Sequence, residues 1–600
     1  MNIHEILKKH YGYESFREGQ EVLIQHILKS EDTLGIMPTG AGKSICYQVP
    51  AVAMEGISLV ISPLISLMKD QVGALNQVGI RAAYFNSSLS AAQYEKALEN
   101  AKKYMYKIIY VAPERLLNEA FLSFAKKMKI AMVCVDEAHC VSRWGQDFRP
   151  SYLKISTFIE ALDFRPVISA FSATATQEVK TDIIKMLHMQ HPFELVTGFD
   201  RENLYFAVEK PKDKYAYVAS YIKKNIEKSG IIYCLSRKLV EEVCEKLRLE
   251  GISVTRYHAG LSDAERLHNQ DAFIFDEVAV MVATNAFGMG IDKSNISYVI
   301  HYNMPMNMES YYQEAGRAGR DGKRAECILL YGGQDVRLNQ FLIEQGGSQE
   351  GSDIEMIEKI RSKERERLRL MTFYCSIQTC LRQYMLQYFG DVTHTTCNNC
   401  SNCLANYEEV DIKKETFCIL HCVEECFQRY GISVITDTLR GSKSTKIIQY
   451  QMDKNSQYGL LHNKSTTQVR DIIQYLLLEN YLELSDSQYP VLKIGTKKLI
   501  NEEPLRMRLL INSSISESKH TTAIEVDNNL YELLKQERKK LAAQAKVPPY
   551  IVFSDKTLQE MSEKKPKNKE DMLNVSGVGE IKFERYGINF LAVIQNYIAA

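Results

Sequence analysis

The sequence lacks several features by which whole classes of protein are recognised. None of its apolar runs approaches the roughly 18 residues that cross a bilayer, so no membrane span is expected. Its first residues contain no apolar block followed by a small-residue cleavage site, which argues against a secretory signal. Neither sign of charge is in excess, since 74 Lys and Arg balance 74 Asp and Glu. The overall charge therefore gives no indication that the protein binds nucleic acid.

The 600 residues have the composition of an ordinary folded protein with several domains. Hydrophobic residues make up 45% and charged residues 25%, which excludes a disordered or collagen-like chain. At roughly 150 residues per domain, the length suggests about four domains. The 14 cysteines are spread along the chain rather than crowded into a short secreted framework, which favours a reducing cytoplasm.

Two successive blocks, residues 1–205 and 206–343, alternate strand-like apolar runs with helical patterns. Runs without polar alternation are typical of strands buried on both faces of a parallel sheet. The sequence therefore predicts an α/β fold with two sheet domains in series and a cleft between them. The runs lie at 58–62, 107–112, 130–135, 167–173, 230–236, 278–284 and 296–302.

Beyond residue 343 the strand-like runs give way to helical and polar sequence. Residues 344–408 are helical, rich in charge and end in a cysteine cluster. Residues 409–515 have the pattern of helix, turn, helix and then a hairpin at 481–495. A polar stretch at 511–522 has the composition of a linker, and residues 523–600 are again mainly helical.

A glycine-rich loop, MPTGAGKS, lies between an apolar stretch and a helical pattern. This is the strand–loop–helix context of a phosphate-binding P-loop, although Met37 stands where the full pattern has glycine. Lys43 would reach the β- and γ-phosphates of ATP, and the Ser44 hydroxyl would bind Mg²⁺. The backbone would wrap around phosphate, so the predicted nucleotide contacts are Thr39, Gly40, Ala41, Gly42, Lys43 and Ser44.

An acidic pair, Asp136 and Glu137, directly follows the buried run 130–135 and opens the sequence DEAH. In open α/β sheets, ligands bind at the carboxyl ends of the strands. Asp136 could then hold Mg²⁺, and Glu137 could orient or deprotonate the attacking water. An acidic pair after a strand is more often a solvated loop, but its place downstream of a P-loop favours catalysis.

Seven short segments occur along the two α/β blocks, in this order: MPTGAGKS, SPLISLMKDQ, DEAH, FSATAT, YHAGL, VATNAFGMGIDK and QEAGRAGRDG. Together they resemble the helicase motifs of superfamily 2, and nearly the whole chain resembles the RecQ family of DNA helicases. The resemblance implies two RecA-like lobes (1–205 and 206–343), a helical zinc-binding subdomain (344–408), a winged helix (409–515) and a small all-α HRDC-like domain (523–600). It also implies that ATP lies between the lobes, with adenine contacts from Tyr13, Arg17 and Gln20.

Two arginines in QEAGRAGRDG, Arg317 and Arg320, have the spacing that places side chains on one helix face. Their planar guanidinium groups suit the charge that develops on a transferring γ-phosphoryl group. By resemblance, Arg320 is the arginine finger and Arg317 a second phosphate or coupling contact. The alternative is a pair of ordinary surface arginines.

An aromatic-rich segment, CVSRWGQDFRPSY (140–152), directly follows DEAH and holds the one tryptophan of the chain. Aromatic faces stack on unpaired bases and arginines bind phosphates, whereas a core loop would use the same aromatics for packing. RecQ proteins resemble this segment closely and use it to sense single-stranded DNA. The resemblance therefore implies DNA contact or coupling for His139, Arg143, Trp144, Phe148 and Arg149.

Cys380, Cys397, Cys400 and Cys403 form a C-x16-C-x2-C-x2-C cluster. Four thiolates at this spacing indicate a closed tetrahedral zinc site, which would stabilise the fold and leave no open position for catalysis. An iron–sulfur cluster also fits the spacing, and Cys375 is an alternative first ligand. The RecQ resemblance favours structural zinc.

The two C-terminal modules supply further candidates for DNA contact by resemblance. In the winged helix, the wing near 485–489 is where related enzymes split the duplex, although its tip here is short and polar. In the HRDC-like module, Tyr550 is the candidate for stacking on DNA. Basic winged-helix residues could bind duplex phosphates or be ordinary surface charges, namely Lys443, Lys446, Lys464 and Arg470.

These observations predict an ATP- and Mg²⁺-dependent DNA helicase with structural Zn²⁺, and the resemblance implies 3′-to-5′ polarity. Its partners would be single-stranded, forked or junction DNA, single-strand-binding protein and other recombination proteins, in the cytoplasm or on a bacterial nucleoid. One rival is an RNA helicase of superfamily 2, against which the cysteine cluster and the C-terminal modules argue. The other is a DNA-binding scaffold with a vestigial ATPase, against which the intact set Lys43, Asp136, Glu137 and Arg320 argues.

Overall fold

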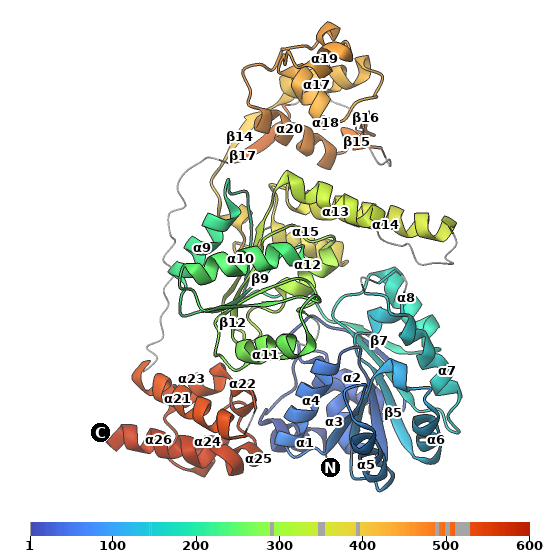
Figure 1. The fold of residues 1–600 in the computed structure, drawn as a ribbon, viewed down its shortest axis with the longest axis vertical. Coiled ribbons are helices and arrows are strands. Elements are labelled where there is room, and N and C mark those ends of the chain that lie inside the picture. The colour runs from blue at the N-terminus through green and yellow to red at the C-terminus, as the bar shows by residue number, and fades with distance from the viewer. Residues whose placement is uncertain are drawn as a thin grey trace.

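Two parallel sheets flanked by helices form the first half of the chain, and three smaller parts follow them (Figure 1). The computed structural model describes residues 2–142, 144–145, 147–288, 293–345, 354–391, 396–485, 491–497, 504–510, 528–545 and 547–599. In this part of the chain, no helix is long and apolar enough to cross a membrane.

The first sheet has seven parallel strands in the order β3-β4-β2-β5-β6-β1-β7. They are β1 (Thr33–Ile36), β2 (Ile57–Ile61), β3 (Ala82–Phe85), β4 (Ile108–Val111), β5 (Ile130–Val135), β6 (Val167–Ser172) and β7 (Phe193–Val196). Successive residues of one strand enter different cores, since Leu59 and Ile61 pack in one and Val60 in another. The unbroken apolar runs of the sequence are therefore buried on both faces, as predicted.

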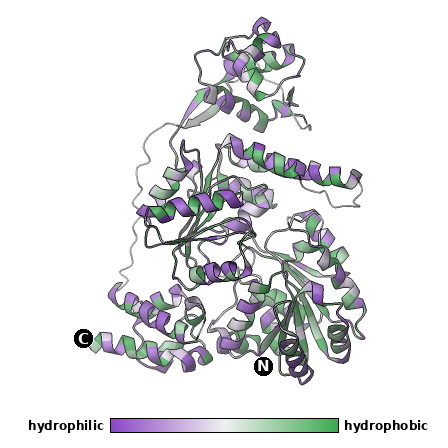
Figure 2. Ribbon diagram, viewed as in Figure 1, coloured by the Kyte–Doolittle hydropathy of each residue, from purple (hydrophilic) through white to green (hydrophobic). Residues whose placement is uncertain are grey.

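Helices cover both faces of this sheet, and Figure 2 shows its strands as mainly hydrophobic. A short helix, α1 (Ile3–Ile6), precedes them near the N-terminus. The covering helices are α2 (Gln20–Leu28), α3 (Lys43–Ala53), α4 (Ile65–Gln77), α5 (Ala91–Lys102), α6 (Glu119–Lys127), α7 (Lys154–Glu160) and α8 (Gln177–Met186).

The second sheet has six parallel strands in the order β10-β11-β9-β12-β13-β8. The strands are β8 (Leu204–Glu209), β9 (Ser229–Tyr233), β10 (Val254–Tyr257), β11 (Val280–Ala283), β12 (Ile296–His301) and β13 (Ala325–Leu330). Its helices are α9 (Lys214–Lys224), α10 (Arg237–Leu249), α11 (Asp263–Ile274), α12 (Met308–Ala315) and α13 (Gly333–Gln345). The α/β fold with two sheet domains is thus as the sequence predicts.

The cysteine-containing part adds α14 (Ile354–Tyr374), α15 (Leu381–Tyr388) and α16 (Ser401–Leu404). Its Met371, Tyr374 and Leu381 are buried in the same continuous core as Ile61 of the first sheet and Val299 of the second. The two sheet domains and this subdomain therefore share one hydrophobic core.

The winged-helix part contains α17 (Lys413–Glu425), α18 (Ile432–Leu439), α19 (Thr445–Gln449), α20 (Thr466–Leu478) and the antiparallel hairpin β15 (Leu482–Leu484) with β16 (Leu492–Ile494). It also contains an antiparallel pair, β14 (Tyr407–Asp411) with β17 (Arg506–Leu510), which the sequence reading did not anticipate. This part has a core of its own. Of the predicted wing at 485–489, residues 486–489 lie outside the described residues, as does the predicted linker at 511–522.

The C-terminal helical domain contains α21 (Asn528–Ala545), α22 (Pro549–Val552), α23 (Asp555–Lys564), α24 (Lys569–Leu573), α25 (Glu580–Lys582) and α26 (Ile588–Ala599). It encloses its own core and lies beside the first sheet domain (Figure 1). The contact is partly polar, since Gly577 N donates to Gly12 O at 3.1 Å and Tyr586 Oη donates to Gln77 Oε1 at 2.8 Å. It is also partly apolar, because Ala74 of α4 packs against the core of the C-terminal domain.

Candidate active site

The P-loop connects β1 to α3 at the carboxyl edge of the first sheet. Gly40 and Gly42 have φ values of +87° and +83°, a left-handed conformation that would strain any residue with a side chain. Both glycines line a cleft at this edge of the sheet. Helix α3 begins at Lys43, so its first free N–H groups point toward the same space. The Lys43 ammonium donates to Met37 O at 3.1 Å, which folds the side chain back over the loop.

The acidic pair follows β5, at the same edge of the sheet. Asp136 is buried, and burial together with the Glu137 charge raises its pKa to about 7, while the Lys43 ammonium opposes the increase. Burial lowers the pKa of Lys43, and the two carboxylates oppose that change. Glu137 has a left-handed backbone (φ +49°), a conformation that costs a non-glycine residue of the order of 1 kcal/mol. The sheet edge therefore holds an acid pair and an ammonium close together.

The predicted adenine segment lies next to the P-loop. Arg17 Nη1 donates to Gly40 O at 2.6 Å, and Gln20 Nε2 donates to Ala41 O at 3.0 Å and to Gly42 O at 3.1 Å. Tyr13 lies at the mouth of the cleft with 39% of its surface exposed. Arg17 and Gln20 thus fix the P-loop backbone, and their contact with a base stays a prediction.

Arg317 and Arg320 come from the second sheet domain and reach the same cleft. Helix α12 ends at Ala315, so the two arginines lie in the turns that follow it rather than on one helix face, and the helical placement was wrong. Gly316 ends the helix, and Gly319 (φ +58°) continues the chain as a turn. Turn geometry, rather than helical spacing, directs both guanidinium groups into the cleft.

A cleft of about 380 Å³ brings these groups together from three parts of the chain. Its walls include Ser294 and Gln313 of the second sheet domain and Ser554 of the C-terminal helical domain. Tyr550, predicted to contact DNA, lies in this wall, and its stacking on DNA stays a prediction. The predicted residues that line the cleft are Tyr13, Arg17, Gln20, Thr39, Gly40, Gly42, Lys43, Ser44, Asp136, Glu137, Arg317, Arg320 and Tyr550.

The aromatic loop connects the acid pair to the surface. His139 is buried, with Nδ1 at 3.0 Å from Ser172 Oγ and 3.4 Å from Glu137 Oε2, and burial lowers its pKa. Farther along, Arg149 Nε donates to Asp147 Oδ2 at 3.0 Å, and Phe148 lies beside it in the sequence. Arg143 lies outside the described residues. The loop therefore begins at a histidine that contacts the catalytic candidate Glu137.

Trp144 packs against α14, a contact that sequence reasoning missed. The Lys363 ammonium lies 3.8 Å from the centre of the Trp144 ring, Lys359 lies at 5.6 Å, and Arg367 Nη2 donates to Trp144 O. The charge-rich pattern of α14 was visible in the sequence, but no local signal tied it to a loop more than 200 residues earlier.

The basic winged-helix candidates divide into two kinds. Lys464 forms an ion pair with Glu415 at 2.9 Å. Lys443, Lys446 and Arg470 are exposed. The exposed residues remain available to a phosphate backbone, whereas Lys464 already has a carboxylate partner.

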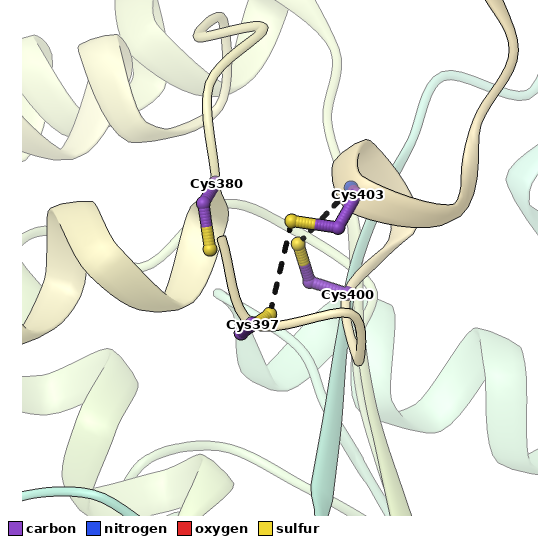
Figure 3. A group of neighbouring side chains, drawn as sticks. All are labelled: Cys380, Cys397, Cys400 and Cys403. Carbon is purple, nitrogen blue, oxygen red and sulfur yellow. Dashed lines mark hydrogen bonds between the residues drawn. The ribbon is translucent and has the colours of Figure 1, made fainter. Parts of the chain in front are cut away.

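Four cysteine sulfurs converge between α15 and α16 (Figure 3). The Sγ atoms of Cys380, Cys397, Cys400 and Cys403 all lie within 4.8 Å of one another, and Cys397 and Cys403 are 3.9 Å apart. Tetrahedral zinc with Zn–S distances of about 2.3 Å requires sulfurs about 3.8 Å apart. An iron–sulfur cluster would place several iron and sulfide atoms between the thiolates and needs a wider spacing. Cys375 lies outside the group, so the four predicted cysteines fit zinc.

Models of five protein families match successive parts of the chain. They are the DEAD/DEAH box helicase (17–182), the helicase conserved C-terminal domain (213–322), the RecQ zinc-binding domain (333–404), the RQC domain (406–515) and the HRDC domain (527–594).

Whole-chain relatives agree with these matches. The ATP-dependent DNA helicase RecQ of Bacillus subtilis is 42% identical over 593 residues, covering 99% of this chain and 98% of the relative. The proteins of the same name from Haemophilus influenzae and Pasteurella multocida are 37% and 36% identical, covering 99% of this chain and 96% and 93% of the relatives. With the P-loop, the acid pair and the four-cysteine cluster in one chain, these matches show that it belongs to the RecQ family of ATP-dependent DNA helicases.

Proposed function

We propose that this enzyme unwinds tailed, forked or junction DNA with 3′-to-5′ polarity during recombination and repair, using Mg-ATP hydrolysis to move along a single strand. The observation that carries the proposal is the cleft whose opposite walls bear Lys43 and Asp136 from one sheet domain and Arg317 and Arg320 from the other. A nucleotide bound there touches both domains, so its hydrolysis can change their relative position.

Residues of this cleft can be assigned roles in attack of water on the γ-phosphate. Lys43 binds the β- and γ-phosphates, Glu137 orients or deprotonates the water, and Arg320 stabilises charge on the γ-phosphoryl group with Arg317 beside it. Ser44 and Asp136 would hold Mg²⁺, and the buried Asp136 carboxylate with Glu137 and a single ammonium beside it is a donor set that fits this cation. When bound, Mg²⁺ supplies charge neutralisation on the phosphate oxygens.

Coupling to DNA runs through the aromatic loop in this proposal. Base stacking on Trp144 would displace its ring from Lys363 of α14, and the movement would reach Glu137 through His139. Arg143, Phe148, Arg149 and Tyr550 are further DNA-contact candidates.

The domain limits that accompany this function are 1–205 and 206–343 for the lobes, 344–408 for the zinc subdomain, 409–515 for the winged helix and 523–600 for the HRDC-like domain. The segment 197–203 connects the two sheets and ends just before β8 (Leu204–Glu209), so the first limit lies two residues inside this strand of the second sheet. We place the enzyme in the cytoplasm, on the nucleoid in a bacterium, with single-strand-binding and other recombination proteins as partners.

Strand separation on matched substrates tests polarity and substrate together. Duplexes of one sequence, made as DNA or RNA and carrying a 3′ or a 5′ tail, are incubated with enzyme, ATP and Mg²⁺. We expect fast separation of the 3′-tailed DNA duplex alone. Equal separation of 5′-tailed DNA would contradict the polarity, and faster separation of the RNA duplex would favour the RNA helicase alternative.

A further inference from the structure

Arg201 lies in the segment that carries the chain from the first sheet to the second, between β7 and β8. It belongs to neither the P-loop nor the arginine loop, which we define as residues 316–320. The two loops approach closely, since a Cβ added to Gly316 would lie 3.3 Å from Thr39 Cβ. A side chain placed between them can set their separation.

The guanidinium of Arg201 bonds to both loops at once. Its Nη1 donates to Thr39 O in the P-loop at 2.5 Å and to Gly316 O at 3.3 Å. Its Nη2 donates to Ala318 O at 3.2 Å and to Gly319 O at 2.8 Å, both in the arginine loop. One planar group therefore bridges the two halves of the nucleotide cleft.

All of these acceptors are backbone carbonyls. Among the described residues no carboxylate forms an ion pair with Arg201, and burial lowers its pKa, with the charges of Arg320 and Arg17 acting in the same direction. An arginine nevertheless stays charged in proteins, so the cation depends on these carbonyls for compensation. Separating the loops would leave a desolvated charge with fewer partners, which favours the arrangement in which both loops are in place.

The backbone around Arg201 is held independently of the nucleotide. Arg382 of α15 donates to Arg201 O at 2.8 Å, and Asn399 Nδ2 donates to Glu202 O at 2.8 Å. Asn203 Nδ2 donates to Gly319 O at 2.9 Å. The cysteine-containing subdomain thus anchors the segment from which Arg201 reaches the two loops.

We propose that Arg201 is a positioning residue that sets the arginine loop against the P-loop, so that ATP meets Arg317 and Arg320 already aligned with Lys43. Arg201 is not among the residues that line the cleft, so it acts through the loops rather than on the nucleotide. The inference rests on the proposed function, in which Arg320 stabilises the transferring γ-phosphoryl group. A lysine cannot replace Arg201, because a single ammonium group lacks the forked guanidinium that reaches both loops.

The test compares full-length variants in DNA-stimulated ATP hydrolysis, nucleotide binding and thermal unfolding. We expect Arg201→Gln to lower kcat by about 10- to 100-fold, the cost of a small misalignment at the reacting groups. Its Kd for ATP should change by less than about threefold, because the lost contact acts in the transition state. Arg201→Lys should be impaired to a similar extent. Arg324→Gln removes an exposed arginine of the same domain and should match the wild type.

A double variant separates positioning from general structural support. If Arg201 acts through Arg320, Arg201→Gln combined with Arg320→Ala is no slower than Arg320→Ala alone. The proposal would be overturned if the double variant lost activity by the product of the two single losses. It would also be overturned if Arg201→Gln both unfolded at a lower temperature and bound nucleotide more weakly, or if Arg201→Lys kept full activity. Wild-type kcat in Arg320→Ala would refute the role proposed for Arg320 and this inference with it, whereas a slow Arg320→Ala beside an unimpaired Arg201→Gln would refute this inference alone.

Discussion

At the scale of single residues, burial sets the charges in the nucleotide cleft. Asp136 and Glu137 follow one strand and Lys43 opens a helix beside it, so their charges interact, and burial raises the pKa of Asp136 and lowers that of Lys43. Local motifs placed these three residues correctly relative to strand and helix, because a strand end and a helix start are visible in a short stretch of sequence. These residues share one cleft with Arg317 and Arg320 only because the second sheet domain lies against the first. Short sequence patterns do not predict how the two domains are placed.

We expect Glu137→Gln to slow ATP hydrolysis by about 10²- to 10⁴-fold, because an amide cannot accept a proton from the attacking water. Affinity for ATP should change little, since Glu137 acts on the water rather than on the phosphates. Steady-state kinetics and nucleotide titration separate these effects. Glu160→Gln, at an exposed position of the same domain, is the control, and hydrolysis by Glu137→Gln at the control rate would refute the role.

Lys582 provides a second residue-scale prediction, in the C-terminal helical domain. Burial lowers its pKa to about 8, below the value of about 10.4 expected in an unfolded chain. The unfolded state therefore binds the proton more tightly, so the charge destabilises the fold below pH 8, and the penalty disappears as the pH rises from about 8 to 10.4.

We expect Lys582→Met to stabilise this domain at pH 7 by about 1–3 kcal/mol and to lose the advantage above about pH 10. Amide hydrogen exchange of α23 to α26 reports the local stability. Lys569→Met changes an exposed lysine of the same domain and should have little effect. A gain for Lys582→Met that does not depend on pH would show that ionisation is not its cause.

At the scale of elements, the contact between the aromatic loop and α14 is where the proposed coupling to DNA can be tested. We expect Trp144→Ala to bring the ratio of hydrolysis rates with and without single-stranded DNA close to one, because the stacking face and its contact with Lys363 are both removed. Trp144→Phe should keep part of the stimulation, since a phenyl face still stacks. Undiminished stimulation of Trp144→Ala would count against the sensor loop.

The cysteine cluster joins α15 and α16 and supports the segment that bears Arg201. We expect Cys400→Ser to lose zinc and to unfold at a lower temperature, by roughly 6–12 °C if about 3 kcal/mol is lost. Elemental analysis and thermal denaturation measure the two effects. Cys418→Ser changes a cysteine outside the cluster and should keep the metal, and a zinc-free wild type would refute the site.

Elements with strong local patterns were predictable, and those defined by distant partners were not. The buried strands β2 and β5 appear as unbroken apolar runs. The pair β14 with β17 joins segments about a hundred residues apart, and neither has an apolar run that marks a buried strand. Arg317 and Arg320 were expected on a helix because of their spacing, but glycines beside them end the helix.

At the scale of the whole molecule, one core unites the two sheet domains with the cysteine-containing subdomain, while the winged helix and the C-terminal helical domain have separate cores. The C-terminal domain nevertheless supplies Tyr550 and Ser554 to the nucleotide cleft, more than 400 residues after the P-loop. No sequence pattern indicates that placement. The zero net charge is likewise an average, which leaves exposed basic residues such as Lys443 and Lys446 free to meet phosphate.

The central claim is that a single cleft between the two sheet domains hydrolyses ATP and responds to DNA. The most direct test is the rate of ATP hydrolysis with and without single-stranded DNA, for the wild type and for Lys43→Ala. We predict strong stimulation of the wild type by DNA, and loss of hydrolysis in Lys43→Ala by ~10²-fold or more with DNA binding retained. A wild-type rate that DNA does not change, or a Lys43→Ala variant as fast as the wild type, would contradict the account.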